Sequence, residues 1–363
     1  MANTTVSAAN RAIEFQRKYH AEYIRSNRFK RYMGSSENSI ICVKEDLTKK
    51  KGDTINIPLV GALPMTEYNT GSTTLVGNEK ALPNEGHRVT VGVVRDATVV
   101  NVEEEQASSI DIYNAGKTAL KDLQMRYLRN DTINAFNSKN GENYADASEA
   151  VKDQWLAANS DRVLFGADVG NTVAGDHSAS LLNVDAASDR LTGDTIDKAK
   201  FLAQNATVAN GDGIRPFKYS EDFESYVLFC NSFDFRDFRN WLTSTGNLKD
   251  AMERGRNNPL FAGPESFEWN GVMIRHVPEI GTIGGGNAGI DVNPSFLCGT
   301  QALAAVWAQR TKLTIRKEDD YGFQRGVGFM EMRKIDKCQY AQGTANAVDW
   351  GMVTMYNAAV ANS

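Results

Sequence analysis

Cysteine and histidine are scarce and scattered in this sequence. The four cysteines lie far apart and include no Cys-x-x-Cys pair, whereas zinc sites and disulfide frameworks need closer or patterned spacing. The four histidines form no His-Glu-x-x-His pair. We therefore expect reduced, mostly buried thiols, no metal site and no cofactor. The residues concerned are Cys42, Cys230, Cys298, Cys338, His20, His87, His177 and His276.

Long apolar runs and an excess of positive charge are also missing. No apolar stretch approaches the roughly 20 residues needed to span a bilayer, and residues 1–10 lack the apolar centre of a signal peptide. The 363 residues carry 40 basic and 45 acidic side chains, a net charge of −5. A dedicated nucleic-acid-binding protein normally has a basic domain. We expect a cytosolic protein without membrane contact.

The sequence has no group of residues that would supply a nucleophile and its base. Residues 284–289 satisfy the G-x-G-x-x-G pattern of dinucleotide sites, but that pattern must open a helix. Residues 290–294 cannot start a long helix, so a flexible glycine loop is expected. A P-loop and a G-x-S-x-G turn are absent as well. We interpret the acidic residues 318–320 as a salt-bridged edge, and we predict that the protein is not an enzyme.

Two strand-like runs enclose an unusually long connection. Residues 53–60 and 88–102 alternate apolar with polar side chains, the period of a strand with one apolar face. Residues 61–87 between them are rich in Gly, Thr and Asn. A connection of this length is uncommon inside a compact domain and usually indicates a binding loop or disorder. The pattern predicts a long hairpin arm that makes its contacts on another molecule.

Residues 7–34 are predicted to form a basic, aromatic-rich helix. Phe15, Tyr19 and Tyr23 recur every four residues and form one stripe. The segment holds seven basic and two acidic residues, so its charge is +5 in a chain of −5. It could dock on an acidic neighbour or face packaged nucleic acid, or it could be a solvated amphipathic helix.

The remaining pattern predicts an α+β fold. The longest helix is expected over residues 103–138, capped by Asn101, and would be on the order of 50 Å long. Further helices are expected around 151–158, over 194–208, and through Phe235, Phe238 and Trp241. Strands are expected at 225–230, 269–277, 296–305, 312–317, 328–335 and 352–356. No regular βαβ repeat and no internal repeat are visible.

Several stretches resemble a branch of the major capsid proteins of tailed bacteriophages. They are YIRSNRF at 23–29, KGDTINIPL at 51–59, NGVMIRHVPE at 270–279, DYGFQRGVG at 320–328 and the closing strand at 349–359. The order of the predicted elements is also similar, and the resemblance spans nearly the whole chain. It implies the tailed-phage capsid fold, which herpesvirus capsid floors and encapsulin shells share.

The resemblance implies a division of the chain into five parts. An N-terminal arm would occupy residues 1–48 and an extended β-hairpin loop 49–98. A peripheral domain with a long spine helix would follow at 99–193, then an axial domain at 194–305. Return strands of the peripheral domain and a C-terminal strand would occupy 306–363. No scaffolding segment precedes the arm, which favours a separate scaffolding protein.

The function implied is that of a major capsid protein with no catalytic role. The chain would self-assemble from hexamers and pentamers into an icosahedral virion shell in the host bacterial cytoplasm. It would enclose double-stranded DNA without sequence-specific binding, and would work with scaffolding, portal and decoration proteins but no membrane. Alternatives are an encapsulin-like nanocompartment shell or a cytosolic enzyme with an unrecognised site. Assembly contacts are expected from Arg25, Arg28, Lys30, Arg31, Tyr68 and Lys80.

Lys80 raises the question of a covalent shell. It is the only lysine within residues 61–87, and some relatives join neighbouring subunits through a lysine–asparagine isopeptide bond. Asn346, with Asp349 nearby in sequence, is the candidate partner. A solvated lysine is the simpler interpretation, so we predict that no cross-link forms.

Overall fold

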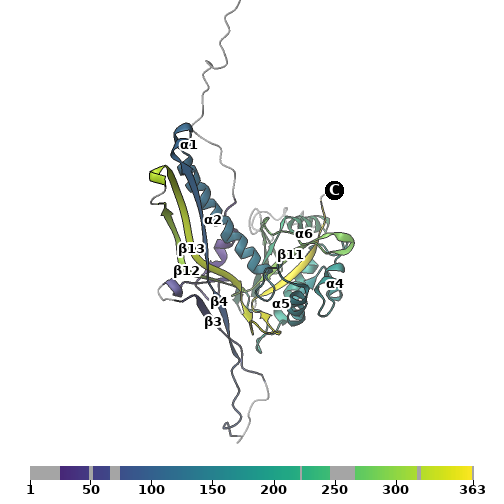
Figure 1. Cartoon of the computed structure of the whole chain (residues 1–363). Helices are drawn as coiled ribbons and strands as arrows, with labels where there is room; N and C mark the ends of the chain where they lie inside the picture. The colour runs from purple at the N-terminus through teal and green to yellow at the C-terminus, as the bar shows by residue number, and fades with distance from the viewer. Residues whose placement is uncertain are drawn as a thin grey trace, which may run out of the picture. The chain divides into compact units, whose positions relative to one another are not determined.

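The computed structural model describes residues 25–48, 52–65, 74–220, 223–245, 266–316 and 320–361, and the statements below concern these residues. The chain forms two compact units (Figure 1). The first contains Val93–Leu128, Gln309–Met332 and the described end of Met1–Asn27; the second contains Arg28–Gly92, Arg129–Ala308 and Arg333–Ser363. Both helices and strands are well represented, which confirms the α+β class.

In the first unit, a helix packs on one face of a sheet. Its elements are β5 (Gly92–Asn101), α1 (Val102–Ala107), most of α2 (Ile112–Asn137), and parts of β12 (Leu303–Ile315) and β13 (Gln324–Lys337). Leu120 of α2 lies in a small core with Val327 and Phe329 of β13. Alternate residues of β13 contribute to this core, as expected when one face of a sheet is covered.

The prediction of one unbroken helix over residues 103–138 is wrong, because Ser108 to Asp111 separates α1 from α2. The Ser108 hydroxyl accepts a hydrogen bond from the Ile110 amide at 3.2 Å, and Asp111 accepts one from the Asn114 amide at 2.9 Å. Short polar side chains of this kind compete with helical hydrogen bonds and start a new helix. Asn101 does precede α1, but its side chain makes no capping bond.

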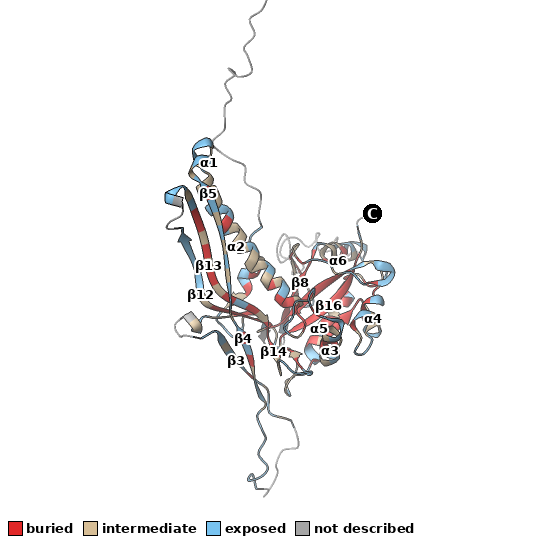
Figure 2. Cartoon of the chain, viewed as in Figure 1, coloured by how far each residue is buried: buried red, intermediate tan, exposed pale blue. Residues whose placement is uncertain are grey.

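The second unit is built on a seven-stranded sheet of order β6-β16-β11-β8-β10-β9, with β7 paired to β8. β16 runs antiparallel to β11 and parallel to β6. Every residue of β16 is buried, as its red colour in Figure 2 shows. The strands are β6 (Val163–Phe165), β7 (Lys218–Ser220), β8 (Phe223–Cys230), β9 (Ser266–Trp269), β10 (Val272–His276), β11 (Asp291–Cys298) and β16 (Met352–Ala359).

Helices cover both faces of this sheet. α5 (Gly193–Asn205) and α6 (Ser232–Ser244) share a core with Val353 and Met355 of β16. α3 (Glu149–Ala158) and α4 (His177–Leu182) share another with Tyr356 and Ala358. Odd and even residues of a strand point to opposite faces, so the two helix pairs lie on opposite sides. The helices expected at 151–158, at 194–208 and through Phe235 are confirmed. No helix in the described ranges is long and apolar enough to cross a bilayer.

The predicted hairpin arm is present. β3 (Thr54–Val60) pairs antiparallel with β4 (Asn84–Thr90), from Thr54 opposite Thr90 to Val60 opposite Asn84. The second run was predicted as one strand over 88–102, which is wrong in its bounds. It divides at Val91, whose amide donates to the Asp53 carbonyl at 2.8 Å, and β5 begins at Gly92.

Two other predicted strands are divided by turns. The run 269–277 forms β9 and β10, joined at Asn270 and Gly271, whose φ values of 44° and 76° fit a tight two-residue hairpin turn. The run 296–305 contributes to β11 and to β12, which belong to different sheets. The chain turns between them at Thr300 and Gln301, and Gly299 just before the turn packs against the Arg215 carbonyl, where a Cβ would overlap.

The helix predicted over residues 7–34 is wrong in its described part, and the stripe of Phe15, Tyr19 and Tyr23 lies outside the described residues. η2 (Arg28–Tyr32) is a 3₁₀ turn followed by β1 (Met33–Gly34). Three residues per 3₁₀ turn place Phe29 and Tyr32 on one side, where both are buried.

A second sheet has the order β1-β2-β12-β13-β5, and β14 and β15 form a small pair. The elements not yet given are β2 (Ile41–Lys44), η3 (Asp46–Thr48), η4 (Ser160–Arg162), η5 (Val169–Asn171), η6 (Asn287–Gly289), η7 (Asp320–Gly322), β14 (Gln339–Tyr340) and β15 (Val348–Asp349).

Candidate assembly surfaces

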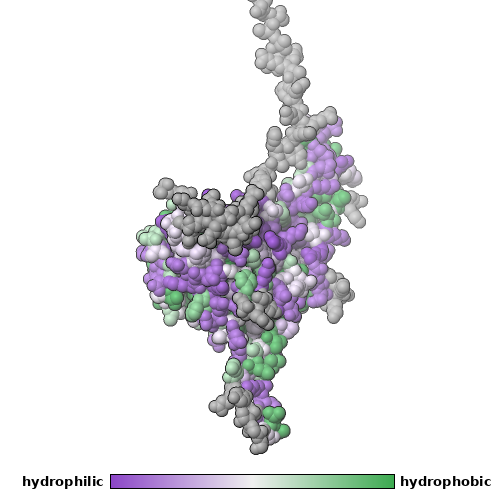
Figure 3. Space-filling model, turned by 180° about the vertical axis from the view of Figure 1, so that it is seen from behind, coloured by the Kyte–Doolittle hydropathy of each residue, from purple (hydrophilic) through white to green (hydrophobic). Residues whose placement is uncertain are grey.

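The arm exposes an unusual amount of apolar surface. Figure 3 shows hydrophobic (green) side chains along it, between uncertain segments drawn in grey. Large contiguous apolar patches on a soluble protein usually mark an interaction site. The exposed residues are Val60 (53% exposed), Leu63 (54%), Met65 (101%), Leu75 (66%), Val76 (80%) and Leu82 (49%). These side chains are therefore uncovered in the single chain.

The segment Arg28–Tyr32 has an anchored side and an open side. The ring centroids of Phe29 and Tyr32 lie 5.1 and 5.2 Å from that of Phe229 on β8. Arg28 donates a hydrogen bond to the His276 carbonyl at 2.7 Å, so it fastens the segment to its own subunit. Lys30 and Arg31 are exposed. Of these three basic residues, the exposed pair is the better placed for contacts with other molecules.

The other predicted assembly residues are not brought together. Arg25 is exposed in the first unit, Lys80 is exposed on the arm, and Tyr68 lies outside the described residues. Asn346 is exposed, but Asp349 is buried (1% exposed).

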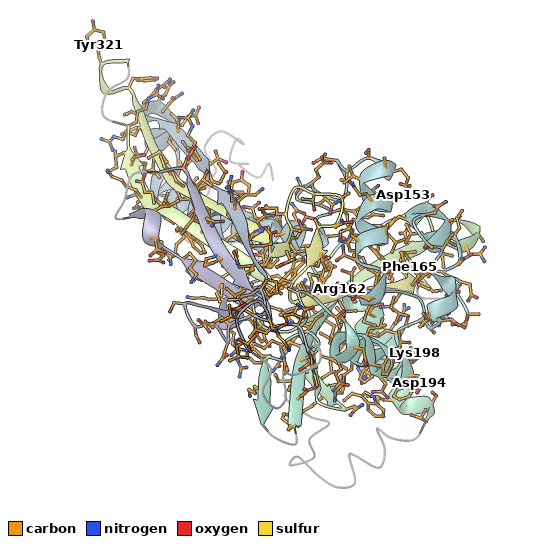
Figure 4. The ribbon with its side chains drawn as sticks, turned by 90° about the horizontal axis from the view of Figure 1, so that it is seen from below. Asp153, Arg162, Phe165, Asp194, Lys198 and Tyr321 are labelled. Atoms are coloured by element: carbon orange, nitrogen blue, oxygen red, sulfur yellow. The ribbon has the colours of Figure 1, made fainter. Side chains whose placement is uncertain are left out.

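A second exposed apolar group was not predicted. Tyr321, labelled in Figure 4, points outward from the ribbon with its side chain fully exposed and a φ of 54°. Leu313 and Ile315 of β12 are each 65% exposed, and Phe323 is 40% exposed. The sequence signal was available only in part: Leu313 and Ile315 alternate with polar residues, but the five charged residues 316–320 separate them from Tyr321 and Phe323.

Asp349 belongs to a buried polar cluster that holds the second unit together. Its carboxylate accepts hydrogen bonds from Lys337 Nζ, Trp155 Nε1 and Gln339 Nε2, each at 3.0 Å. Burial raises the pKa of Asp349, but Lys337 and the Gln339 bond outweigh this effect, so its pKa lies below the usual range. The carboxylate is therefore ionised and fully engaged in structure. Arg162, labelled in Figure 4, donates to the Asp349 carbonyl at 2.6 Å.

Lys139 lies beside this cluster without a hydrogen-bond partner for its Nζ. The Nζ is 3.6 Å from the centroid of the Trp155 ring. Complete burial, followed by repulsion from Lys337, lowers the pKa of Lys139 well below its usual value. The sequence analysis did not predict this cluster, because residues 139, 155, 337 and 349 are far apart and form no sequence motif.

A second buried carboxylate, Asp234, sits at the start of α6. It accepts hydrogen bonds from Asn293 Nδ2 at 3.0 Å, Asn357 Nδ2 at 3.1 Å and the Ser295 hydroxyl. Burial raises the pKa of Asp234 to about 6 despite these bonds. Asn357 Oδ1 is buried and lacks a hydrogen-bond partner. Rotation of this amide would let it accept a bond from protonated Asp234.

Residues that resembled metal or cofactor ligands are engaged in local structure. The four cysteines are free and buried, as predicted. Glu149, Asp153 and Asp176 lie close together, but Asp153 accepts from the His177 amide and Asp176 from the Ala179 amide, both at 2.8 Å. After the glycines at 284–289 comes strand β11 and not a long helix, which agrees with the prediction of a glycine loop. The acidic residues 318 and 319 lie outside the described ranges.

Both the sequence and the structure of the chain are similar to those of known phage capsid proteins. The sequence matches the phage capsid protein family over residues 3–361. The structure is similar to the capsid asymmetric unit of cyanophage Pam1, with a TM-score of 0.88 and 30% identity over 100% of both chains. It also resembles the capsid of Ralstonia phage GP4 (TM-score 0.75, 17% identity, 100% of both chains).

A third similar structure is the head of Helicobacter pylori bacteriophage KHP40 (TM-score 0.65, 12% identity, 97% of this chain and 96% of that one). None of the curated proteins matches the sequence. The family match and the full-length likeness confirm the tailed-phage capsid fold, including its hairpin loop and spine helix, and nothing favours the encapsulin or enzyme alternatives. The chain belongs to the phage capsid protein family and is a structural major capsid shell protein.

Proposed function

We propose that this chain assembles through hexamers and pentamers into a closed icosahedral shell around a double-stranded DNA genome, in the cytoplasm of its bacterial host. The observation that carries the proposal is the arm. In its described part, six large exposed apolar side chains lie at or beyond the loop end of β3 and β4, two strands anchored by the buried Leu59 and Val89. A rigid root and an uncovered apolar end suit an element that overlaps a neighbouring subunit.

The five expected parts receive corresponding roles in this proposal. Residues 1–48 would act as the N-terminal arm and 49–98 as the extended loop. Residues 99–193 and 306–363 would form the peripheral domain, and 194–305 the axial domain. Repeated contacts between copies would add stability that a single subunit lacks, because binding of the native state shifts the folding equilibrium.

The shell would enclose DNA without reading its sequence. The net charge of −5 supports a container and not a dedicated DNA-binding protein. Exposed basic residues such as Arg25, Lys30 and Arg31 could still contact the genome or an acidic neighbour. Separate scaffolding, portal and decoration proteins would complete the particle.

Electron microscopy of the expressed full-length protein tests the proposal. The protein is produced alone and together with the products of its neighbouring genes, then examined by negative stain. Rings or closed shells are expected, at least in the co-expressed sample. Compact monomers in both samples would contradict the proposal.

A further inference from the structure

Hydrogen bonds fasten the arm to the rest of the second unit at two places, one just beyond the end of β3 and one within β4. At the first, the Ala62 amide donates to the Ala209 carbonyl at 2.9 Å, and Asn210 Nδ2 donates to the Ala62 carbonyl at 3.3 Å. Both polar groups of one backbone residue are thus held by one turn. This pair of bonds is the first clamp.

The turn that makes the first clamp is strained. Ala209 and Asn210 have φ values of 49° and 63°, the left-handed region. Asparagine tolerates this region, but for alanine it costs roughly 1–2 kcal/mol. Gly61 permits the close approach, because a Cβ there would overlap the Cβ and the carbonyl of Ala209. Strain of this kind persists only where the surroundings enforce it, often at functional segments.

The second clamp holds the other strand. The Arg88 amide of β4 donates to Gln342 Oε1 at 2.7 Å, and Gln342 Nε2 donates to the Arg88 carbonyl at 3.1 Å. The Gln342 side chain therefore occupies the place that a neighbouring strand would take. An unpaired strand edge is otherwise open to association.

Close packing also holds the two paired strands, because Leu59 is 4% exposed and Val89 is 1% exposed. Beyond Leu59, a pocket of about 410 Å³ is lined by Val60 and Ala62 of the arm and by Ile214 and Trp350. A second pocket of about 260 Å³ is lined by Pro58 and Leu59 on the same strand. Nearer the body, Ile55, Ile57 and Val89 do pack into a core. The direction in which the arm leaves the subunit is therefore set by this packing together with the two clamps.

We infer that the Ala209–Asn210 turn and Gln342 are positioning residues that fix the direction of the arm, so that it leaves the subunit as a directed lever and not as a loose tether. The inference rests on the proposed function of the arm. Losing either clamp frees the arm to swing into the space that the pockets leave beside β3.

Amide hydrogen exchange on the unassembled full-length subunit tests both clamps separately. Gly61→Ala disrupts the first clamp and Gln342→Ala the second. Gly92→Ala is the matched control, because a Cβ there meets no atom within 4 Å. We expect exchange to rise about tenfold or more at Ala62 in the first variant and at Arg88 in the second, since the amides open more often. The control keeps wild-type rates.

A spin-label pair at Val76→Cys on the arm and Leu182→Cys on α4 measures the direction itself. The distance distribution should be narrow with the clamps intact and broad in both clamp variants. Wild-type exchange rates or an unchanged distribution in Gln342→Ala would overturn the inference, even if Gly61→Ala fails to fold. Neither measurement needs shells, so a failure of the proposed function would be recognised separately, by microscopy.

Discussion

Lys337 and Asp349 illustrate how single residues hold the second unit together. Each side chain is 1% exposed, and their charged atoms are 3.0 Å apart. A buried charge is tolerated only when a partner and hydrogen bonds replace the lost water. Lys337 also donates to the Ser138 carbonyl at 2.7 Å, so the pair is joined to a segment 199 residues away in the sequence.

Removing one member of this pair should be severe. Lys337→Ala leaves Asp349 buried without its cation, and we expect the free energy of unfolding to fall by about 3–5 kcal/mol. Lys334→Ala, at an exposed position of the same strand, is the control and should change it by less than about 0.5 kcal/mol. Urea denaturation measures both. Equal effects of the two substitutions would show that the buried pair has no special role.

Asp234 should make stability depend on pH. Its native pKa of about 6 exceeds the ordinary value near 4, so the native state binds more protons between these pH values. Stability from this group is therefore lost as the pH rises through that window. His87 and His177, whose pKa values burial lowers to about 4 and about 3, act in the opposite direction.

A difference measurement isolates Asp234 from the histidines. The free energy of unfolding of the wild type minus that of Asp234→Asn is measured by urea denaturation at several pH values from about 4 to 7. The difference should fall by about 2–3 kcal/mol over this range. A difference that stays constant with pH would show that Asp234 is ionised throughout.

At the scale of elements, the sequence predicts that a helix or strand is present more reliably than it predicts where that element begins and ends. Apolar periodicity located α3, α5, α6, β8 and β16, because each has one face or both faces in a core. The predictions of continuous strands over 269–277 and 296–305 were wrong for two different reasons. Asn270-Gly271 is a strong hairpin signal, yet apolar residues on both sides make it look like a continuous strand. The packing of Gly299 against Arg215 has no local signal at all.

The basic element near the start of the chain was predicted correctly in charge and wrongly in shape. Phe29 and Tyr32 are drawn into the aromatic core around Phe229, which favours a short 3₁₀ turn in the described part. Periodicity cannot reveal this, because the partners lie about 200 residues away. The same packing decides which basic side chains remain exposed.

Exposed basic residues of this element should act in assembly and not in folding. The double variant Lys30→Glu/Arg31→Glu is expected to impair assembly or genome retention, more strongly at low salt, with an unchanged melting temperature. Arg28→Glu should instead lower the melting temperature, because it breaks the bond to the His276 carbonyl. Particle yield by gradient sedimentation and thermal unfolding are measured for each. Wild-type yields of full particles from the double variant would refute this assignment.

At the scale of the whole molecule, we expect the shell to be held together without covalent links. Asp349 is engaged by Lys337, Trp155 and Gln339 inside its own subunit, so it is poorly placed to take a proton from Lys80 of a neighbour. Mature particles boiled in detergent should release a single band near 39.9 kDa on a gel. A ladder of covalent oligomers would contradict this, and its loss in Lys80→Arg would identify the lysine.

If the apolar arm joins subunits, as we propose, its deletion should abolish shell assembly. The variant lacking residues 72–83 and the full-length chain are produced under identical assembly conditions and compared by analytical ultracentrifugation, with electron microscopy of the same samples. The deletion removes the exposed Leu75, Val76 and Leu82 but no buried residue of the described part. We expect the deletion variant to form folded, soluble subunits that sediment as small species, while the full-length chain forms shells. Closed shells of normal size and yield from the deletion variant would contradict it.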